Sequence, residues 1–518
     1  MGIITNRRVN PLIASRKKIL ALATLGMICL MMPVIMKIVD PVQVIARYRT
    51  RVAIDSPVHE LLKQELEAVH MSAYLFNVTN AERFMSGEDQ KLKVEEVGPF
   101  TYRELRSNED LEIDTDEGVV RYSPKITPVF SPEESIADPH NVTVALPNIA
   151  LLTMVSMMSE YPFLSRMGFN MLTMQLGTKA LVTMSAHDYL WGYNESLITV
   201  GNTFMPGWIS FDTMGLMDRL YDKNVPYRLE VGATNADKFQ IKTLNKLGGL
   251  RMWGYEDPSL RTKCNSFENA YEGIGYPTDL SPSTPVRIFR NVLCRMLELD
   301  FHHTMTMEYG AQALVYKISN RTFANGCDKN CTCMKGICIE GLSDISPCFY
   351  NLPLAVSNAH FLYGGPELFE RIEGLQPDEE KHGSEFFIEP KVGAVLKTSF
   401  SIQVNIVLGD VRYNEQARRF ADMALPVGYF KIVQPDLPEL NKAEMRMLYI
   451  TGPYIALGLQ VAFSLVGVIL LVFAMRLLYW NWICSEGRGI AFQIPDEGKK
   501  VPILSVESPL MRTESYLG

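Results

Sequence analysis

Two apolar stretches stand at the ends of the chain, and the sequence between them is polar enough to fold in water. Ile19–Met36 and Tyr454–Met475 contain no charged residue. At ~1.5 Å per residue, helices of these lengths would reach roughly 27 and 33 Å, close to the hydrocarbon thickness of a bilayer. The pattern predicts transmembrane helices at residues 19–36 and 454–475. It also predicts one large domain, residues 37–453, on a single side of the membrane.

Basic residues before the first apolar stretch set the predicted orientation. Residues 1–18 contain no acidic residue and carry basic residues at Arg7, Arg8, Arg16, Lys17 and Lys18. Basic flanks stay on the cytoplasmic side, so the tail 1–18 is predicted to be cytoplasmic, and two spans return the tail 476–518 to the same side. A cleaved signal peptide is the alternative for residues 19–36. Its exit, residues 32–37, lacks a small-x-small cleavage pattern, which favours an uncleaved signal-anchor.

The segment between the spans begins with a helix pattern and continues with strand patterns. Ser56-Pro57, followed by apolar positions up to Val69, predicts a capped amphipathic helix soon after the first span. Alternation at residues 92–97 predicts a strand, and the apolar positions on either side of Asp116-Glu117-Gly118, at residues 111–113 and 119–122, predict a hairpin with this turn. Residues 400–408 alternate most regularly and predict the clearest strand of the chain.

Residues 148–193 differ, because they have a helical composition and are rich in methionine. The apolar stretch from Val144 to Met158 is too short to span a membrane, so we expect a helix in a helical cap. Strands, then helices, then strands predict an α+β fold with a mainly antiparallel sheet. The methionines have two interpretations: they fill the core, or they form an adaptable apolar surface that accepts varied ligands.

Most cysteines are crowded into one part of the segment between the spans. Such crowding indicates disulfides in an oxidising compartment or a zinc site in the cytosol. The basic N-terminal tail and the glycosylation sequons favour the lumenal side, and therefore disulfides. Because seven is an odd number, at least one thiol is free or pairs with another chain. The seven are Cys264, Cys294, Cys327, Cys331, Cys333, Cys338 and Cys348.

Five N-glycosylation sequons also fall between the predicted spans. Since this segment is most of the chain, their placement agrees with the topology but does little to test it. They are at Asn77, Asn141, Asn194, Asn320 and Asn330.

Charge and motifs exclude several classes of function. The formal net charge is −8, and no long basic stretch exists beyond the N-terminal flank, which argues against a nucleic-acid partner. The sequence has no Gly-x-Ser-x-Gly elbow, no phosphate-binding loop and no His-Glu-x-x-His motif. His302 and His303 are expected to point to opposite faces of a strand. We therefore expect no enzymatic activity, no metal and no cofactor.

Several short segments resemble the class B scavenger receptors in their order and spacing. The family includes fatty-acid translocase, the high-density-lipoprotein receptor, a lysosomal membrane receptor and insect croquemort-like members. With the two-span topology, the resemblance covers nearly the whole chain. The segments are Glu96–Arg103, Leu190–Tyr193, Cys294-Arg295, His360–Leu362, Ile372–Pro377 and Ile388–Pro390.

The resemblance implies an antiparallel β-barrel ectodomain with a lipid-lined tunnel, topped by a helical bundle on which ligands dock. In this chain the bundle corresponds to residues 148–193. Cationic residues are sparse there, whereas strongly anionic particles would need more of them. The implied ligand-binding residues are Met154, Met157, Met158, Arg166, Met167, Met171 and Lys179.

The family's cysteine pattern implies three disulfides in this chain. They are Cys264–Cys331, Cys294–Cys348 and Cys333–Cys338, with Cys327 left over. Cys327 is an alternative partner for Cys331.

One departure from the family bears on the ligand. Several relatives have a lysine directly after the cysteine that matches Cys348, and this chain has Phe349 instead. A lysine at this position could pair with a fatty-acid carboxylate, and phenylalanine cannot. Together with the sparse cations of the cap, this favours neutral lipids such as sterols or carotenoids.

The C-terminal part of the chain bears on location and assembly. Residues 496–504 lack the acidic dileucine spacing of the lysosomal relative, which favours the plasma membrane over the endolysosomal membrane. Cys484 is a candidate for palmitoylation, with an idle cytosolic thiol as the alternative. Gly458 and Ala462 form a small-xxx-small pair that hints at helix association and so at a homo-oligomer.

The sequence therefore predicts a cell-surface receptor for lipids, lipoproteins or other lipid-bearing particles. It would bind them at the helical cap and transfer lipid (fatty acid, sterol or carotenoid) through the tunnel to the membrane. Transfer needs no catalysis, because apolar burial holds the lipid and the bilayer is a favourable sink. The alternative is a recognition receptor for cell debris, pathogens or a protein partner, without lipid transfer.

Overall fold

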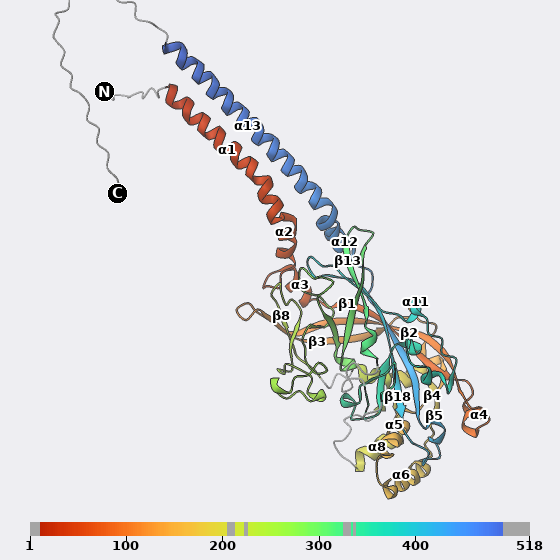
Figure 1. Ribbon diagram of the computed structural model, residues 1–518. Coiled ribbons are helices and arrows are strands. Elements are labelled where there is room, and N and C mark those ends of the chain that lie inside the picture. Colours follow the sequence, from red (N-terminus) through yellow and green to blue (C-terminus); the bar gives the residue numbers. More distant parts are fainter. Residues whose placement is uncertain (1–10, 205–212, 222–225, 325–332, 335–337, 490–518) are drawn as a thin grey trace, which may run out of the picture. The chain divides into compact units, whose positions relative to one another are not determined.

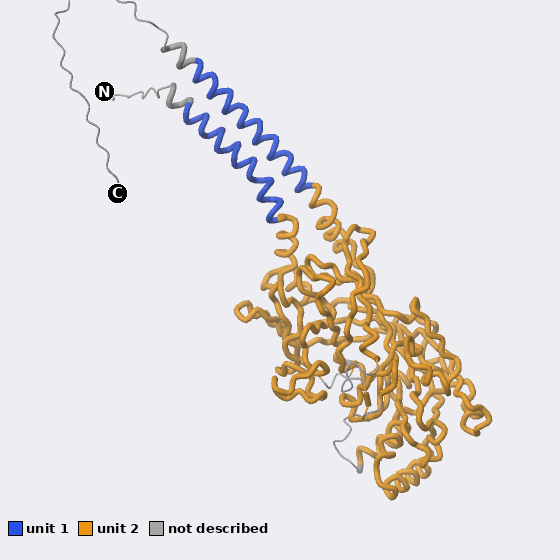
Figure 2. The backbone as a smooth tube through the Cα atoms, in the orientation of Figure 1, with its two compact units in different colours: residues 1–39, 455–518 blue, residues 40–454 orange. Residues whose placement is uncertain are grey.

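The computed structural model describes residues 11–204, 213–221, 226–324, 333–334 and 338–489. The chain divides into two compact units (Figure 2). We call residues 40–454 the large unit, and we call the other unit, which ends at Val39 and resumes at Ile455, the helix pair.

The helix pair is built from long apolar helices. Helix α1 (Pro11–Val39) contains the candidate membrane span Arg16–Val39. The second candidate span, Glu439–Ile483, includes most of α13 (Gly452–Gly489). Both helices cover the predicted spans and extend beyond them.

Two glycines allow α1 and α13 to approach each other closely. A Cβ atom on Gly26 would lie 2.9 Å from Leu471 Cγ, and one on Gly467 would lie 2.8 Å from Leu30 Cγ. Larger residues at either position would push the helices apart. Gly458, which the small-xxx-small pattern singled out, is elsewhere: a Cβ atom there meets nothing within 4 Å.

The large unit is built on one extensive sheet, with fifteen strands in the described part of the chain. The strands are β1 (Leu66–Val78), β2 (Leu92–Asp114), β3 (Val119–Phe130), β8 (Leu229–Gly232), β9 (Ile241–Leu244), β10 (Ala270–Tyr271), β11 (Val286–Arg290), β12 (Arg295–Thr306), β13 (Gln312–Ile318), β14 (Ser343–Asp344), β15 (Leu354–Ser357), β16 (Ile372–Glu373), β17 (Glu385–Ile388), β18 (Val395–Leu408) and β19 (Met423–Val433). Figure 1 shows the longest of them crossing the unit.

The strand order is β10-β11-β12-β13-β17-β18-β19-β1-β2-β3-β8-β9, with β14 and β15 beside β18, and β16 beside β2. Pairing is antiparallel except between β10 and β11 and between β16 and β2. A bridge between Gln240 and Tyr271 links the two ends of this order, so the sheet curls into a nearly closed barrel. The predicted α+β fold with a mainly antiparallel sheet is confirmed.

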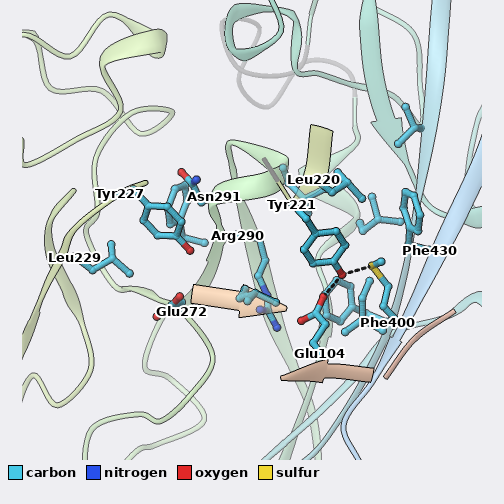
Figure 3. A pocket seen from close by; sticks show the side chains of 17 residues that line it. Glu104, Leu220, Tyr221, Tyr227, Leu229, Glu272, Arg290, Asn291, Phe400 and Phe430 are labelled. Carbon is cyan, nitrogen blue, oxygen red and sulfur yellow. Dashed lines mark hydrogen bonds between the residues drawn. The ribbon is translucent and has the colours of Figure 1, made fainter. Parts of the chain in front are cut away.

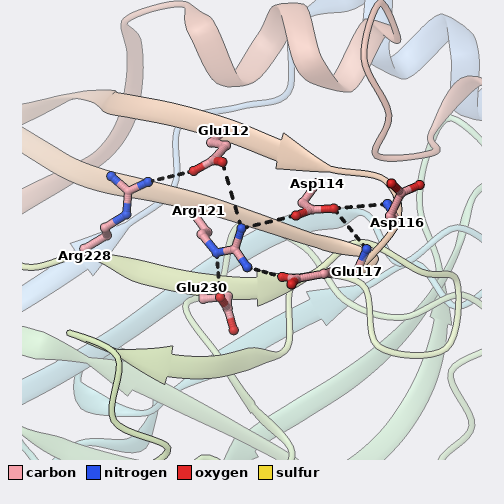
Figure 4. A network of polar contacts seen from close by, with 7 residues as sticks. All are labelled: Glu112, Asp114, Asp116, Glu117, Arg121, Arg228 and Glu230. Atoms are coloured by element: carbon pink, nitrogen blue, oxygen red, sulfur yellow. Dashed lines mark hydrogen bonds and ion pairs between the residues drawn. The ribbon is translucent and has the colours of Figure 1, made fainter.

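The predicted hairpin around residues 116–118 is formed by β2 and β3. Asp114 pairs with Val119 across the turn, and Gly118 adopts a left-handed φ of 66° that favours glycine. Next to the turn, the guanidinium of Arg121 gathers carboxylates from three segments (Figure 4). It contacts Glu117, lies 3.5 Å from Asp114 on β2, and donates to Glu230 on β8 at 2.7 Å. The network joins the hairpin to its neighbouring strand.

Strand β18, the clearest strand in the sequence, is buried on both faces from Phe400 to Leu408. The side chains of Gln403 and Asn405 form hydrogen bonds instead of meeting solvent. Gln403 Nε2 donates to Asn405 Oδ1 at 2.8 Å, and Asn405 Nδ2 donates to Ser357 Oγ on β15 at 3.0 Å. This pairing satisfies polar groups that burial alone would penalise.

A helical cap lies at one end of the large unit (Figure 1). It contains α5 (Ile149–Met158), α6 (Phe163–Leu176), α7 (Ala186–Trp191), α8 (Ser196–Phe204) and α9 (Leu216–Leu220). Two small sheets accompany it, β4 (Thr143–Pro147) with β5 (Leu181–Ser185), and β6 (Tyr193–Asn194) with β7 (Thr213–Met214). The expected helix from Val144 is thus corrected to a strand and a helix. Asn148 separates them, because its side chain accepts from Leu151 N and caps α5.

Shorter helices complete the large unit: α2 (Pro41–Arg49), α3 (Pro57–Lys63), α4 (Ala81–Ser86), α11 (Glu379–His382) and α12 (Glu439–Arg446). Ser56 caps α3 as predicted, accepting from His59 N at 3.1 Å. The expectation that this helix reaches Val69 was wrong. Leu66 and Val69 lie in β1, where pairing with Arg106 and Glu104 of β2 supplies backbone partners that an exposed helix could not.

Candidate functional site: an apolar cavity inside the sheet

A largely apolar cavity lies within the curled sheet of the large unit (Figure 3). The space between its lining side chains, including open solvent, is about 810 Å³. Phe400, Ile402 and Val404 line it because every second residue of a strand faces the same side. Phe430 and Ile432 of β19 follow the same rule on the neighbouring strand. The cavity can therefore receive a hydrocarbon chain or ring system.

One charged pair beside the cavity is self-contained. Arg106 Nη2 donates to Glu272 Oε2 at 2.8 Å, and the Tyr122 hydroxyl donates to the same oxygen at 2.9 Å. The side chains of Arg106 and Glu272 are only 8% and 6% exposed. Their opposite charges compensate each other, as buried charges must.

A second carboxylate, Glu104 on β2, has a neutral partner. The Tyr221 hydroxyl donates to Glu104 Oε1 and also lies 3.2 Å from Met71 Sδ. Burial, and then the neighbouring Glu104 carboxylate, raise the pKa of Tyr221 well above its ordinary value. Tyr221 therefore remains a neutral donor, and this contact places no positive charge beside Glu104.

The methionine-rich cap divides into a core helix and a surface helix. Met154 on α5 is buried, and Met157 and Met158 at its end are half-buried. By contrast, Met167 and Met171 on α6 are exposed, as is Lys179 after it. Both interpretations of the methionines thus apply, each to a different helix.

Helix α6 presents an apolar face with no described partner over it. Leu164 is 72% exposed and Met171 64%, and the exposed positions recur at helical spacing. Arg166 is half-buried, and its Cζ atom lies 5.7 Å from the ring centroid of Tyr413. Its guanidinium group is therefore only partly exposed to solvent. The face consists of Phe163, Leu164, Met167, Met171 and Met174. We call it the α6 face.

A second polar cluster joins distant parts of the chain. His360 Nε2 donates to Glu96 Oε2 at 2.7 Å, and the Tyr429 hydroxyl donates to the same oxygen at 2.8 Å. His382 stacks on His360. Burial works to raise the pKa of Glu96, but the hydrogen bonds from His360 and Tyr429 outweigh it and lower that pKa. The carboxylate is therefore held ionised.

The same cluster has the residue types of a metal site, since the ligand atoms of Glu96, His360 and His382 lie within 4.8 Å of one another. Its hydrogen bonds argue against that use. Gln376 N donates to His360 Nδ1, and Asp378 N donates to His382 Nδ1. Each Nδ1 is thus an acceptor, and Nε2 carries the ring hydrogen in the neutral form. Neither ring has a free lone pair to offer, and the residues do not fit a metal centre.

Comparison with known proteins identifies the family. A sequence model of the CD36 family matches residues 19–478. The chain belongs to the CD36 family. The match runs from the first candidate span into the second, as the predicted resemblance to class B scavenger receptors requires. In this family context, the two candidate spans fit the predicted two-span membrane topology.

Curated CD36-family relatives are similar at low identity over most of their length. Lysosome membrane protein 2 of Rattus norvegicus is 27% identical over 457 residues, 86% of this chain and 88% of the relative. Scavenger receptor class B member 1 of Bos taurus is 24% identical over 426 residues, 80% and 81% of the two chains. That receptor from Sus scrofa is 26% identical over 368 residues, 70% and 69%.

Two disulfides implied by the CD36-family pattern are present. The structure joins Cys294 to Cys348 and Cys333 to Cys338. Cys264 is also disulfide-bonded, while its expected partner Cys331 lies outside the described residues, as does Cys327.

The expected modification sites are placed as follows. Asn141, Asn194 and Asn320 are exposed. Asn77 is half-buried in β1, and its Oδ1 accepts from Ala145 N at 2.8 Å. Asn330 lies outside the described residues, and Cys484 lies in α13 with its side chain outside them.

Three further residues that the sequence singled out are Phe349, His302 and His303. Phe349 is half-buried and packs against the main core, and it does not line the cavity. His302 and His303 were expected on opposite faces of β12, and this was wrong. A register shift between Phe301 and His303 turns them together, and their Nδ1 atoms are 2.8 Å apart.

Proposed function

We propose that this CD36-family protein is a non-enzymatic, membrane-anchored receptor that takes lipid from lipid-bearing particles and passes it through the cavity to the bilayer. The particles would dock on the α6 face, and the cell surface is the proposed location. The observation that carries the proposal is the cavity, because its alternating side chains from β18 and β19 provide an apolar wall.

The chemistry of the cavity supports transfer over catalysis. Apolar side chains hold lipid by burial, at roughly 25 cal/mol per Å² of apolar surface removed from water. Glu272 is hydrogen-bonded to Arg106 and Glu104 to Tyr221, and the described lining contains no serine, cysteine, histidine or lysine. The relatives' names, a scavenger receptor and a lysosome membrane protein, agree with a receptor role at a membrane.

Blocking the cavity tests the proposal. Val404→Trp places a large ring in the cavity wall. In cells we expect lipid uptake to fall at least about five-fold while particle binding is retained, since the α6 face is untouched. Val129→Trp is the matched control: it adds the same bulk on β3 at a half-exposed position that does not line the cavity. Uptake that persists in Val404→Trp would overturn the transfer mechanism.

Recognition without transfer is the second candidate, and the α6 face favours it. An exposed apolar surface of this kind marks a binding site for a particle or a protein. Recognition alone would be supported if lipid uptake were the same with an open and a blocked cavity, and if substitutions in the α6 face removed particle binding.

A further inference from the structure

Arg290 is a cation in the cavity wall that has no side-chain partner among the described residues. It ends β11 and lines the cavity together with Glu104 and Tyr221 (Figure 3). Among the described residues, none forms a side-chain hydrogen bond or an ion pair with Arg290. A guanidinium offers five N–H donors, so its donors are available to a ligand.

Glu104 supplies a matching acceptor. Its Oε1 is engaged by Tyr221, and its Oε2 has no hydrogen bond with a described residue. Both Glu104 and Arg290 act electrostatically on Tyr221, which places the two charges around the same ring. In Figure 3 Arg290 lies between Glu272 and Glu104. Arg290 and Glu104, both described residues, form no ion pair with each other.

We propose that Arg290 and Glu104 anchor the hydroxyl group of a neutral lipid in the cavity. A hydroxyl is both acceptor and donor: its oxygen accepts from Arg290, and its hydrogen is donated to Glu104 Oε2. The hydrocarbon part then lies against Met71, Phe400, Ile402 and Phe430. This proposal rests on the proposed function and names the class of lipid that the cavity selects.

Charge balance favours a hydroxyl over a carboxylate. Arg106 already compensates Glu272 at 2.8 Å, and Arg290 is left to balance Glu104. A bound carboxylate would add a second negative charge beside Glu104 in an apolar cavity, where an uncompensated charge is costly. A hydroxyl adds no charge and uses both free groups.

Three probes with one hydrocarbon chain separate these chemistries. Binding of radiolabelled oleyl alcohol to the full-length protein in detergent is compared with oleyl methyl ether, which cannot donate, and with oleate, which is charged. We expect oleyl alcohol to bind roughly ten-fold more tightly than either, because hydrogen bonds to charged groups discriminate at about this level. Equal binding of the ether and the alcohol, or tighter binding of oleate, would overturn the anchor.

Substitutions assign the effect to the two residues. Arg290→Met removes the donors and keeps the aliphatic stem, so the alcohol and the ether should both bind more weakly, while the alcohol keeps the advantage that donation to Glu104 gives it. Arg290→Lys should restore part of the lost affinity. Glu104→Gln removes the negative charge, so oleate should gain relative to the alcohol. If Arg290→Met does not fold, the comparison of the three probes on the unsubstituted protein still tests whether the cavity prefers a hydroxyl group.

The outcomes also separate the anchor from the proposed function. If none of the three probes binds, or if Val404→Trp binds them as well as the unsubstituted protein does, the cavity is not a lipid site. If the three probes bind in the cavity with equal affinity, lipid transfer remains supported, and the proposed hydrogen bonding of a hydroxyl group by Arg290 and Glu104 is wrong.

Discussion

The imidazole rings of His360 and His382 stack with their centroids 4.3 Å apart and their planes 17° apart. The side chains are buried, with 4% and 5% of their residues' surface exposed. Two stacked rings at this distance cannot both carry a charge at low cost. Burial, and then the neighbouring His360, lower the pKa of His382 to about 4.

Acidification should therefore destabilise the large unit. The unfolded chain binds a proton at His382 near pH 6.5 and the folded chain only near pH 4, so stability falls as the pH drops through this window. The lowered pKa of Glu96 acts in the same direction, because its stabilisation is lost as the pH falls through its folded pKa. Asp378 and Lys431, the other charges acting on His382, oppose each other. The loss from His382 should be about 2 to 3 kcal/mol.

His382→Asn is the matched test, since the Asn amide oxygen can still accept from Asp378 N. We expect its unfolding temperature to change less between pH 7 and pH 4.5 than that of the unsubstituted protein. His303→Asn, an exposed histidine, should leave the pH profile unchanged. If the unfolding temperature of His382→Asn changed with pH as much as that of the unsubstituted protein, His382 would not be a source of the acid sensitivity.

The two described disulfides should contribute unequally. Cys294–Cys348 closes a separation of 54 residues and Cys333–Cys338 one of 5. In the chain-entropy model their removal costs about 4 and about 2 kcal/mol, respectively. Paired serine substitutions, compared by unfolding temperature at one scan rate, should show the larger loss for the longer loop. The reverse order would show that native contacts, and not loop entropy, dominate.

Charging the α6 face should weaken particle binding without unfolding the cap. Leu164→Glu combined with Met171→Glu places carboxylates on positions that are already exposed. We expect binding of lipid-bearing particles to fall roughly ten-fold, as for a hot spot of an interface, with an unchanged unfolding temperature. Met252→Glu, equally exposed at 63% but outside the cap, is the control. Full binding by the double variant would place the docking surface elsewhere.

Arg121 should hold the β2–β3 hairpin against β8. Its partners Glu117, Asp114 and Glu230 come from the turn, from β2 and from β8 (Figure 4). In Arg121→Gln we expect faster amide hydrogen exchange in residues 112–121, because the carboxylates then repel one another. Arg261→Gln removes a single exposed pair with Glu268 and should leave this region unaffected.

Local patterns allowed some elements to be predicted and not others. The spans and the 116–118 hairpin follow from long apolar runs and from turn residues, which are local signals. Leu66 and Val69 continue the helical spacing of α3, and only pairing with β2 decides that they form a strand. The bulge beside His302 is likewise invisible without its partner strand.

The site depends still more on distant contacts. Arg290 ends a mostly apolar strand, a position that is usually solvated, and the curled sheet instead places it in the wall of the cavity that Glu104 also lines. Glu96 and His360 lie in segments that resemble the class B scavenger receptors, but the hydrogen bond from Tyr429 to Glu96 and the stacking of His382 on His360 depend on the fold. The methionines could not be divided between core and surface, because α5 and α6 contain three methionines each.

Strand β2 runs unbroken for 23 residues, from Leu92 to Asp114. It carries Glu96 in the histidine cluster, Glu104 at the cavity and Asp114 at the hairpin. Since side chains of a strand alternate between faces, inserting or deleting one residue between Glu96 and Glu104 would move one of these carboxylates to the wrong face. Changes of length are thus far more damaging here than changes of residue, and sequence variation in this strand should be confined to substitution.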